Sequence, residues 1–115
     1  MNSTEEQEQM AVAELLDIKK IRFCHVPNEG KHKVQYRVKQ KRLGVKSGVP
    51  DILIFDSPPK YPNIKGLAIE LKRKRGGKVS EEQEEWLDAL EKRGWAAMVC
   101  YGVDGVLDAL RFYGY

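Results

Sequence analysis

Two short motifs place acidic and basic side chains beside apolar runs. Pro50-Asp51 precedes the run Ile52–Phe55, and Glu70-Leu71-Lys72 follows the run Leu67–Ile69. Short apolar runs of this kind favour β-strands, so Asp51 opens one strand and Glu70 and Lys72 lie near the end of the next. Two carboxylates and one ammonium group brought together at a sheet edge provide what metal-dependent phosphodiester hydrolysis requires.

Strand geometry places Glu70 and Lys72 on one face, because residues two apart on a strand point the same way. The Leu71 side chain points into the core, but its carbonyl stays near the site. If Asp51 faces Glu70, two carboxylates and this carbonyl suit Mg²⁺ or Mn²⁺. We therefore expect Asp51, Glu70 and Lys72 to be catalytic, with Lys72 acting on the attacking water or on the phosphate charge. A salt-bridged strand face is the alternative.

An acid from the first helix is a further candidate metal ligand. Residues 4–20 are expected to form an amphipathic helix, with Glu5, Glu8 and Gln9 on the apolar face and Glu6 opposite. An acid on a core-facing stripe needs a partner, and a metal ion or a metal-bound water is one. We favour Glu8 over Glu5 because it lies further inside the helix. Stabilisation of the helix dipole is the alternative.

Gln83 has two candidate roles. Ser80-x-x-Gln83 is a capping-box pattern that opens a helix, so Gln83 can simply close that helix end. The same side chain can also reach the site from just beyond the Glu70 strand. His25 and His32 do not have the spacing of a zinc site. The sequence also shows no phosphate-binding glycine loop of the Gly-Lys-Ser/Thr type.

The charged residues are distributed unevenly, although the formal net charge is only +3. Residues 1–17 contain acids and no base, and residues 31–46 contain lysines and arginines and no acid. A second basic run follows the Glu70 strand. Two basic segments beside a carboxylate pair favour a phosphate-backbone partner over a merely solvated surface. The residues expected to contact nucleic acid are Arg73, Lys74, Arg75, Lys78, Arg42 and Lys46.

The remaining segments alternate between helical and strand patterns. At 115 residues, the chain has room for one core, and we expect one domain over residues 1–115. The order α-β-α-β-β-α-β-α predicts an α/β sandwich around a mixed four-stranded sheet. Helices are expected at residues 4–20, 32–43, from Ser80 to about Gly94, and at 103–113; strands are expected at 21–26, 51–56, 66–73 and 95–101.

The cysteines and the hydropathy pattern indicate the compartment. Cys24 and Cys100 lie among apolar residues of two expected strands, so we expect buried free thiols in a reducing cytoplasm. His25 is expected to be a half-buried strand residue. No apolar run approaches the roughly 18 residues of a membrane span, and the acidic N-terminus is unlike a signal peptide. We expect a cytoplasmic protein without a membrane partner.

Taken together, these motifs resemble the VRR-NUC (virus-type replication-repair nuclease) family of the PD-(D/E)xK nuclease superfamily. The resemblance implies a restriction-endonuclease-like α-β-α sandwich, catalysis by Asp51, Glu70 and Lys72, dependence on Mg²⁺ or Mn²⁺, and DNA as the substrate. It covers nearly the whole chain and is carried by Asn28-Glu29, Arg42-Leu43-Gly44, Gly48-Val49-Pro50-Asp51-Ile52, Ile69-Glu70-Leu71-Lys72 and Ser80-x-x-Gln83-x-x-Trp86.

The stand-alone phage or bacterial members of this family are similar to homodimeric Holliday-junction resolvases. Without an appended domain, this chain resembles that type, which implies a homodimer that cuts branched or four-way DNA junctions in the cytoplasm, the host's if phage-encoded. The expected dimer face is the last helix, with Leu110, Phe112 and Tyr113. The alternatives are a nicking, flap or restriction-like nuclease, an inactive DNA-binding module, and a protein-interaction domain with a charged surface.

Overall fold

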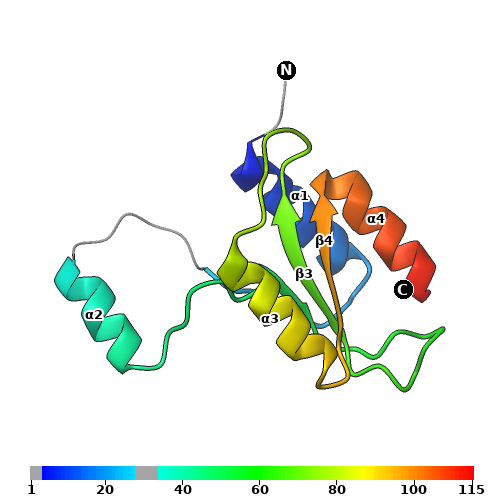
Figure 1. Cartoon of the computed structure of the whole chain (residues 1–115). Coiled ribbons are helices and arrows are strands. Elements are labelled where there is room, and N and C mark those ends of the chain that lie inside the picture. Colours follow the sequence, from blue (N-terminus) through cyan, green and yellow to red (C-terminus); the bar gives the residue numbers. More distant parts are fainter. Residues whose placement is uncertain (1–3, 28–33) are drawn as a thin grey trace.

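The computed structural model describes residues 4–27 and 34–115 of the chain (Figure 1). Asn28, Glu29 and His32 lie outside these residues. Within them, helices and strands follow one another in the order expected from the sequence. The elements are α1 (Glu5–Ile18), β1 (Phe23–His25), α2 (Val34–Arg42), β2 (Ile52–Ile54), β3 (Leu67–Lys72), α3 (Glu81–Glu91), β4 (Ala96–Tyr101) and α4 (Gly102–Tyr113). None of these helices is long and apolar enough to cross a membrane.

The strands of the described residues form one mixed sheet in the order β1-β2-β3-β4. β2 is antiparallel to both β1 and β3, whereas β3 and β4 are parallel. The β2–β3 connection contains three prolines, which cannot donate ladder hydrogen bonds, and it joins the two strands as the expected hairpin loop. All six residues of β3 are buried, which explains why its apolar run does not alternate.

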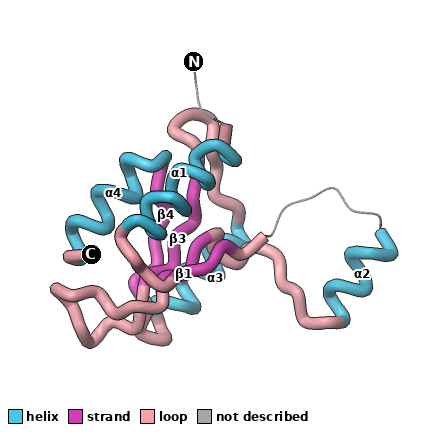
Figure 2. Tube along the Cα trace, turned by 180° about the vertical axis from the view of Figure 1, so that it is seen from behind, coloured by secondary structure: helices cyan, strands magenta, loops and turns pink. Residues whose placement is uncertain are grey.

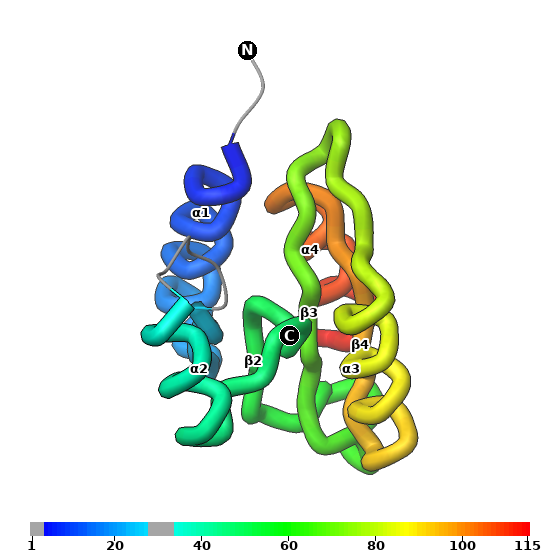
Figure 3. Tube along the Cα trace, turned by 60° about the vertical axis from the view of Figure 1, so that its left-hand side comes forward, coloured from blue at the N-terminus to red at the C-terminus, as the bar shows by residue number. Residues whose placement is uncertain are grey.

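Helices cover both faces of this sheet. α3 lies in front of β3 and β4 in Figure 1, and α1 and α4 lie in front of them in the opposite view of Figure 2. Figure 3 separates the layers, with α1 on one side of β3 and α3 on the other. α1 packs against α4 and β3, and α3 packs against β3 and β4. The fold is therefore the expected α-β-α sandwich.

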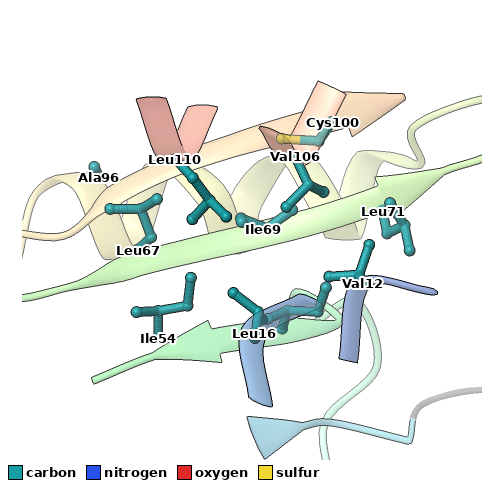
Figure 4. Packing of buried hydrophobic residues seen from close by; sticks show 11 residues of the cluster. Val12, Leu16, Ile54, Leu67, Ile69, Leu71, Ala96, Cys100, Val106 and Leu110 are labelled. Carbon is teal, nitrogen blue, oxygen red and sulfur yellow. The ribbon is translucent and has the colours of Figure 1, made fainter. Parts of the chain in front are cut away.

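The hydrophobic core lies between the sheet and the α1–α4 layer (Figure 4). Val12 and Leu16 follow Glu8 at helical spacing, so one stripe of α1 faces the sheet. Each large aliphatic side chain removed from water contributes about 1.5–3 kcal/mol to this packing. The buried residues include Val12, Leu16, Ile52, Ile54, Leu67, Ile69, Leu71, Val106 and Leu110.

The second helix, α2, stands apart from the sandwich (Figures 1 and 2). None of its residues is buried, and the apolar side chains of Val34 and Val38 are exposed. Lys39, Lys41 and Arg42 lie in its last turn, where cations are favourable to the helix dipole. α2 therefore presents basic side chains outside the core of the protein.

Two expectations about β1 are wrong. Both cysteines are free, as expected, but Cys24 is exposed and only Cys100 is buried. His25 is also exposed rather than half-buried. The physical reason is that β1 is a three-residue strand at the edge of the sheet, so the helical layers cover it only partly.

The last helix is a poor match for the expected dimer face. Leu110 is only 1% exposed because it belongs to the core, so it cannot contact a partner. Tyr113 packs against the same core. The Phe112 ring remains 60% exposed but stacks on Tyr61 from the β2–β3 loop, with ring centroids 5.7 Å apart. Leu110 is therefore excluded from a dimer face, whereas Phe112 remains accessible.

Candidate active site

The register of the β2–β3 pair brings the two sequence motifs together. Ile52 pairs with Ile69, and Leu53 pairs with Ala68. Continuing this antiparallel register by one residue places Asp51 opposite Glu70. Residues directly opposite one another across a ladder point to the same face. The two carboxylates therefore meet at the start of β2, beside the part of β3 that extends past β2.

Asp51 is fixed from both neighbouring strands. Its side chain is 8% exposed, and its Oδ2 accepts a 2.7 Å hydrogen bond from the Leu71 backbone N–H. Its carbonyl accepts a 2.7 Å bond from the Val26 N–H and lies 3.0 Å from His25 Nδ1. These contacts immobilise the carboxylate before any ligand binds, and they hold it beside the Leu71 peptide.

Glu70 is the most buried charged residue of the site, at 2% exposure. Burial raises the pKa of Glu70 to about 8; a hydrogen bond shared with Asp51 and the charge of that carboxylate also raise it, whereas Lys72 lowers it. Glu70 Oε2 accepts a 3.1 Å hydrogen bond from Gln83 Nε2, but Glu70 Oε1 is buried without a donor among the described residues. Either a proton shared with Asp51 or a cation would satisfy this pair.

Lys72 lies on the same face of β3 as Glu70, as the spacing predicts. Its Nζ is 3.5 Å from Glu70 Oε2, and its side chain is only 11% exposed. A side-chain carbon at Gly77 would lie 2.9 Å from Lys72 Cβ, so only glycine lets the β3–α3 loop approach the lysine this closely. The loop thereby packs against the aliphatic part of Lys72.

Gln83 makes the hydrogen bonds expected for both of its candidate roles. Its Oε1 accepts a 2.9 Å hydrogen bond from the Ser80 N–H, and its own N–H is bonded to Ser80 Oγ, which completes the capping box of α3. Its Nε2 then donates to Glu70. The first turn of α3 is thus tied directly to the site.

The first helix places Glu8 elsewhere than expected. Glu8 is buried, but its Oε2 accepts a 2.8 Å hydrogen bond from the Val103 N–H at the start of α4. A separate cleft of about 330 Å³ is lined by Asp51, Leu71 and His25 together with Glu5, Glu6 and Gln9. Glu8 is thus bonded to α4, whereas Glu5 lines the cleft that contains Asp51. Glu6 is exposed, as expected, but it also lines this cleft.

The donor atoms of the site fit a hard divalent cation. They are oxygens: the carboxylates of Asp51 and Glu70 and the Leu71 carbonyl. Glu70 Oε1, which is buried and has no donor among the described residues, is the atom that most needs a cation. Among residues 4–27 and 34–115, no three carboxylate, imidazole or thiol groups form a complete metal-binding cluster. A cation held here would therefore also use the carbonyl, waters or substrate oxygens.

The expected nucleic-acid contacts fall into two regions. Arg73, Arg75 and Lys78 are exposed on the β3–α3 loop, beside the site. Lys74, on the same loop, is paired with Asp104 of α4 at 2.6 Å. Arg42 and Lys46 are exposed near α2 and line a different cleft, next to α3.

His25 belongs to the site region although sequence reasoning did not select it. It pairs with Ile52 across β1 and β2, one residue from Asp51, and it lines the same cleft. Only the β1–β2 register reveals this position, and neither the spacing nor the composition of the sequence encodes that register.

The fold and site together define a class of protein. An α-β-α sandwich in which a Pro-Asp carboxylate meets a Glu-x-Lys strand is the arrangement of the PD-(D/E)xK nucleases. The VRR-NUC domain family matches residues 3–104. This chain therefore belongs to the VRR-NUC family, whose domain implies a nuclease of the PD-(D/E)xK type.

A solved structure supports the same assignment. A protein described as a "VRR_NUC domain protein" matches with a TM-score of 0.81 and 28% sequence identity. The match covers 98% of this chain and 89% of that chain. No curated protein sequence matches this chain significantly.

Proposed function

We propose that this chain is a divalent-cation-dependent endonuclease that hydrolyses phosphodiester bonds in branched DNA, with four-way junctions as its substrate. One observation carries the proposal: Asp51 and Glu70 are buried side by side, and Glu70 Oε1 has no donor among the described residues. The VRR-NUC match supports DNA as the substrate class. Lys72 is held within 3.5 Å of Glu70, where a reacting phosphate would also lie.

Each residue has a defined role in this proposal. Asp51, Glu70 and the Leu71 carbonyl would hold Mg²⁺ or Mn²⁺, and Glu5 replaces Glu8 as the contribution of α1. When bound, the cation supplies Lewis-acid activation of water and neutralises phosphate charge. Lys72 orients the attacking water or stabilises the negative charge that develops on the phosphate.

Gln83 acts as a positioning residue. Its amide nitrogen donates a hydrogen bond to Glu70 Oε2, so Oε1 is the oxygen left to bind a cation. The basic side chains of the β3–α3 loop would bind the backbone of the strand that is cut.

We also propose that the protein acts as a homodimer, because symmetrical cleavage of a junction requires two sites related by a two-fold axis. Sedimentation equilibrium at micromolar concentration would show twice the mass of one chain. If only one protein chain were found per bound junction, this part of the proposal would be contradicted. The catalytic assignment would not be affected.

The deciding experiment compares a labelled four-way junction with its matched linear duplex, each with Mg²⁺, Mn²⁺ or a chelator. The variant is Lys72→Ala, and the matched control is Lys92→Ala, which removes an exposed lysine paired with Asp88 on α3. We expect paired, metal-dependent nicks on the junction with the wild type and with Lys92→Ala, and none with Lys72→Ala.

The other outcomes distinguish the alternatives. Equal cutting of junction and duplex would retain the nuclease and remove the junction selectivity. Preferential cutting of an added flap substrate would favour flap processing. Tight, salt-sensitive binding without cutting in any metal would indicate an inactive DNA-binding module.

A further inference from the structure

A second cleft, outside the carboxylate site, lies between the segment that follows α2 and the first half of α3. It encloses about 430 Å³ and has an unusual lining for a protein surface. Three cationic side chains, Lys41, Arg42 and Lys46, share this lining with two acids, Glu82 and Glu85, and with the indole ring of Trp86. The half-buried Trp86 is not part of the hydrophobic core.

The floor of this cleft is built by close contacts. The Ser47 hydroxyl donates a hydrogen bond to the Glu82 carboxylate. A side-chain carbon at Gly48 would lie 2.8 Å from the Glu82 carbonyl carbon, so the backbone at Gly48 rests directly on α3. These two contacts fix the chain that leads into Asp51 against the first turn of α3.

Both walls of the cleft are connected through the chain to the proposed catalytic residues. On α3, Trp86 lies three residues after Gln83, so the two side chains are neighbours on the helix surface. Gln83 in turn donates its hydrogen bond to Glu70. On the other wall, Ser47 precedes Asp51 by only four residues.

The mixed lining matches the chemistry of one nucleotide. An indole ring stacks on any nucleobase, and such stacking is sequence-tolerant. Lysine and arginine side chains bind the flanking phosphates. A carboxylate accepts hydrogen bonds from exocyclic amino groups, such as that of cytosine. Two acids lie among the three cationic side chains: Glu82, whose carboxylate accepts the Ser47 hydrogen bond, and Glu85. A site that bound phosphate alone would have no use for Glu85.

We propose that this cleft binds one unpaired nucleotide of the DNA substrate next to the scissile phosphate. Trp86 stacks on the base, and Lys41, Arg42 and Lys46 bind its phosphates. Glu85 accepts a hydrogen bond from the exocyclic amino group of adenine or cytosine, which thymine lacks. This inference rests on the proposed action on DNA and adds a requirement for an unstacked base beside the cut.

Fluorescence of Trp86 tests this directly. The chain has two tryptophans, and Trp95→Phe leaves Trp86 as the only one. The Trp95 ring packs edge-on against Phe55 at 6.2 Å, a contact that phenylalanine can retain. In this full-length variant, with chelator present to prevent cutting, we expect saturable quenching by 12-nucleotide dA and dC strands. Binding of dT should be at least about threefold weaker, the loss of one hydrogen bond.

Substitutions separate stacking from folding. Trp86→Leu should weaken dA binding about tenfold, measured by anisotropy of a labelled strand, whereas Trp86→Phe should retain affinity within about threefold. If Trp86→Leu does not fold, as shown by circular dichroism, Lys46→Ala and the quenching itself provide the test. Glu85→Ala should remove the preference for dA and dC while leaving dT affinity unchanged.

The outcomes that would contradict this inference differ from those that would contradict the nuclease proposal. Absence of quenching by any single strand, or equal quenching by a 12-base-pair duplex, would overturn the inference even if the protein cuts junctions. Quenching with the expected base preference in a protein that cuts no DNA would retain the cleft and remove the nuclease proposal.

Discussion

At the scale of single residues, Glu70 is the most deeply buried charged residue among those described. It is 2% exposed and lies beside a second carboxylate, and the only nearby cation is 3.5 Å away on Lys72 among the described residues. An isolated carboxylate in such a position is costly to ionise. The site is thus unfavourable for folding without a bound cation, which is typical of positions retained for function.

This position has a consequence for stability as a function of pH. The pKa of Glu70 is raised from 4.5 to about 8 in the folded protein, chiefly by burial. The folded state therefore keeps a proton on Glu70 over the pH range where the unfolded chain releases it. With chelator present, the free energy of unfolding of the wild type should fall relative to Glu70→Gln as pH rises from 4.5 to 8, by on the order of a few kcal/mol.

Urea unfolding at several pH values measures this difference. Added Mg²⁺ should restore stability most strongly near pH 8, because the cation binds the ionised pair. Glu14→Gln, which removes an exposed acid of α1, is the control and should follow the wild type. A constant difference between wild type and Glu70→Gln across this range would show that Glu70 is ionised in the folded protein throughout.

At the scale of elements, two acids of α1, Glu5 and Glu8, have different surroundings. Glu8 caps α4 through Val103, while Glu5 faces the cleft of Asp51. Glu8→Ala should therefore lower the free energy of unfolding by about 0.5–2 kcal/mol, as for removal of a helix cap, and Glu8→Gln should lose less because it keeps an acceptor oxygen. Glu5→Ala should leave stability unchanged and weaken Mn²⁺ binding about tenfold.

Urea unfolding and calorimetric Mn²⁺ titration distinguish these roles. The variants are Glu8→Ala, Glu8→Gln and Glu5→Ala, with Asp51→Ala as the reference for loss of a ligand. If Glu8→Ala weakened Mn²⁺ binding as much as Asp51→Ala does, at unchanged stability, Glu8 would be the ligand after all. The α4 contact would then be a feature of the cation-free protein alone.

α3 contributes through its first turn, where one side chain serves two functions. Ser80→Ala and Gln83→Leu each disrupt the capping box, so each should cost about 1 kcal/mol of stability. Only Gln83→Leu also removes the donor to Glu70, so only this variant should lower kcat, by about tenfold. Single-turnover cleavage measures the rate. Equal rates for the two variants would limit Gln83 to its capping role.

The order of these elements can be predicted from the sequence because each element is indicated by residues within or next to it. The capping box at Ser80, the apolar run of β3 and the prolines between β2 and β3 each predict structure within a few residues. The sequence also suggests that Asp51 could face Glu70, but the long loop between β2 and β3 does not fix the register, which only the structure shows. The contact of Glu8 with Val103 could not be predicted, since it joins residues 95 positions apart through the docking of α4.

At the scale of the whole molecule, the charges are segregated although the net charge is only +3. Acids occupy the first turns of α1 and α3, where they are favourable to the helix dipoles. Bases are concentrated on α2 and on the β3–α3 loop, beside the carboxylate pair. These two basic regions can therefore attract a polyanion, while the rest of the chain carries a net negative charge.

The salt dependence of DNA binding tests this segregation. Removing one cation that binds a phosphate lowers the slope of log affinity against log salt by about 0.9 on duplex DNA, so replacing Arg73, Arg75 and Lys78 together by alanine should lower it by about 2–3. Lys74→Ala should change it by less, because its ammonium group is already paired with Asp104 at 2.6 Å. Lys92→Ala should leave the slope unchanged. Anisotropy titrations on an uncut junction in chelator provide these slopes, and an unchanged slope in the triple variant would move the DNA path from the β3–α3 loop to α2.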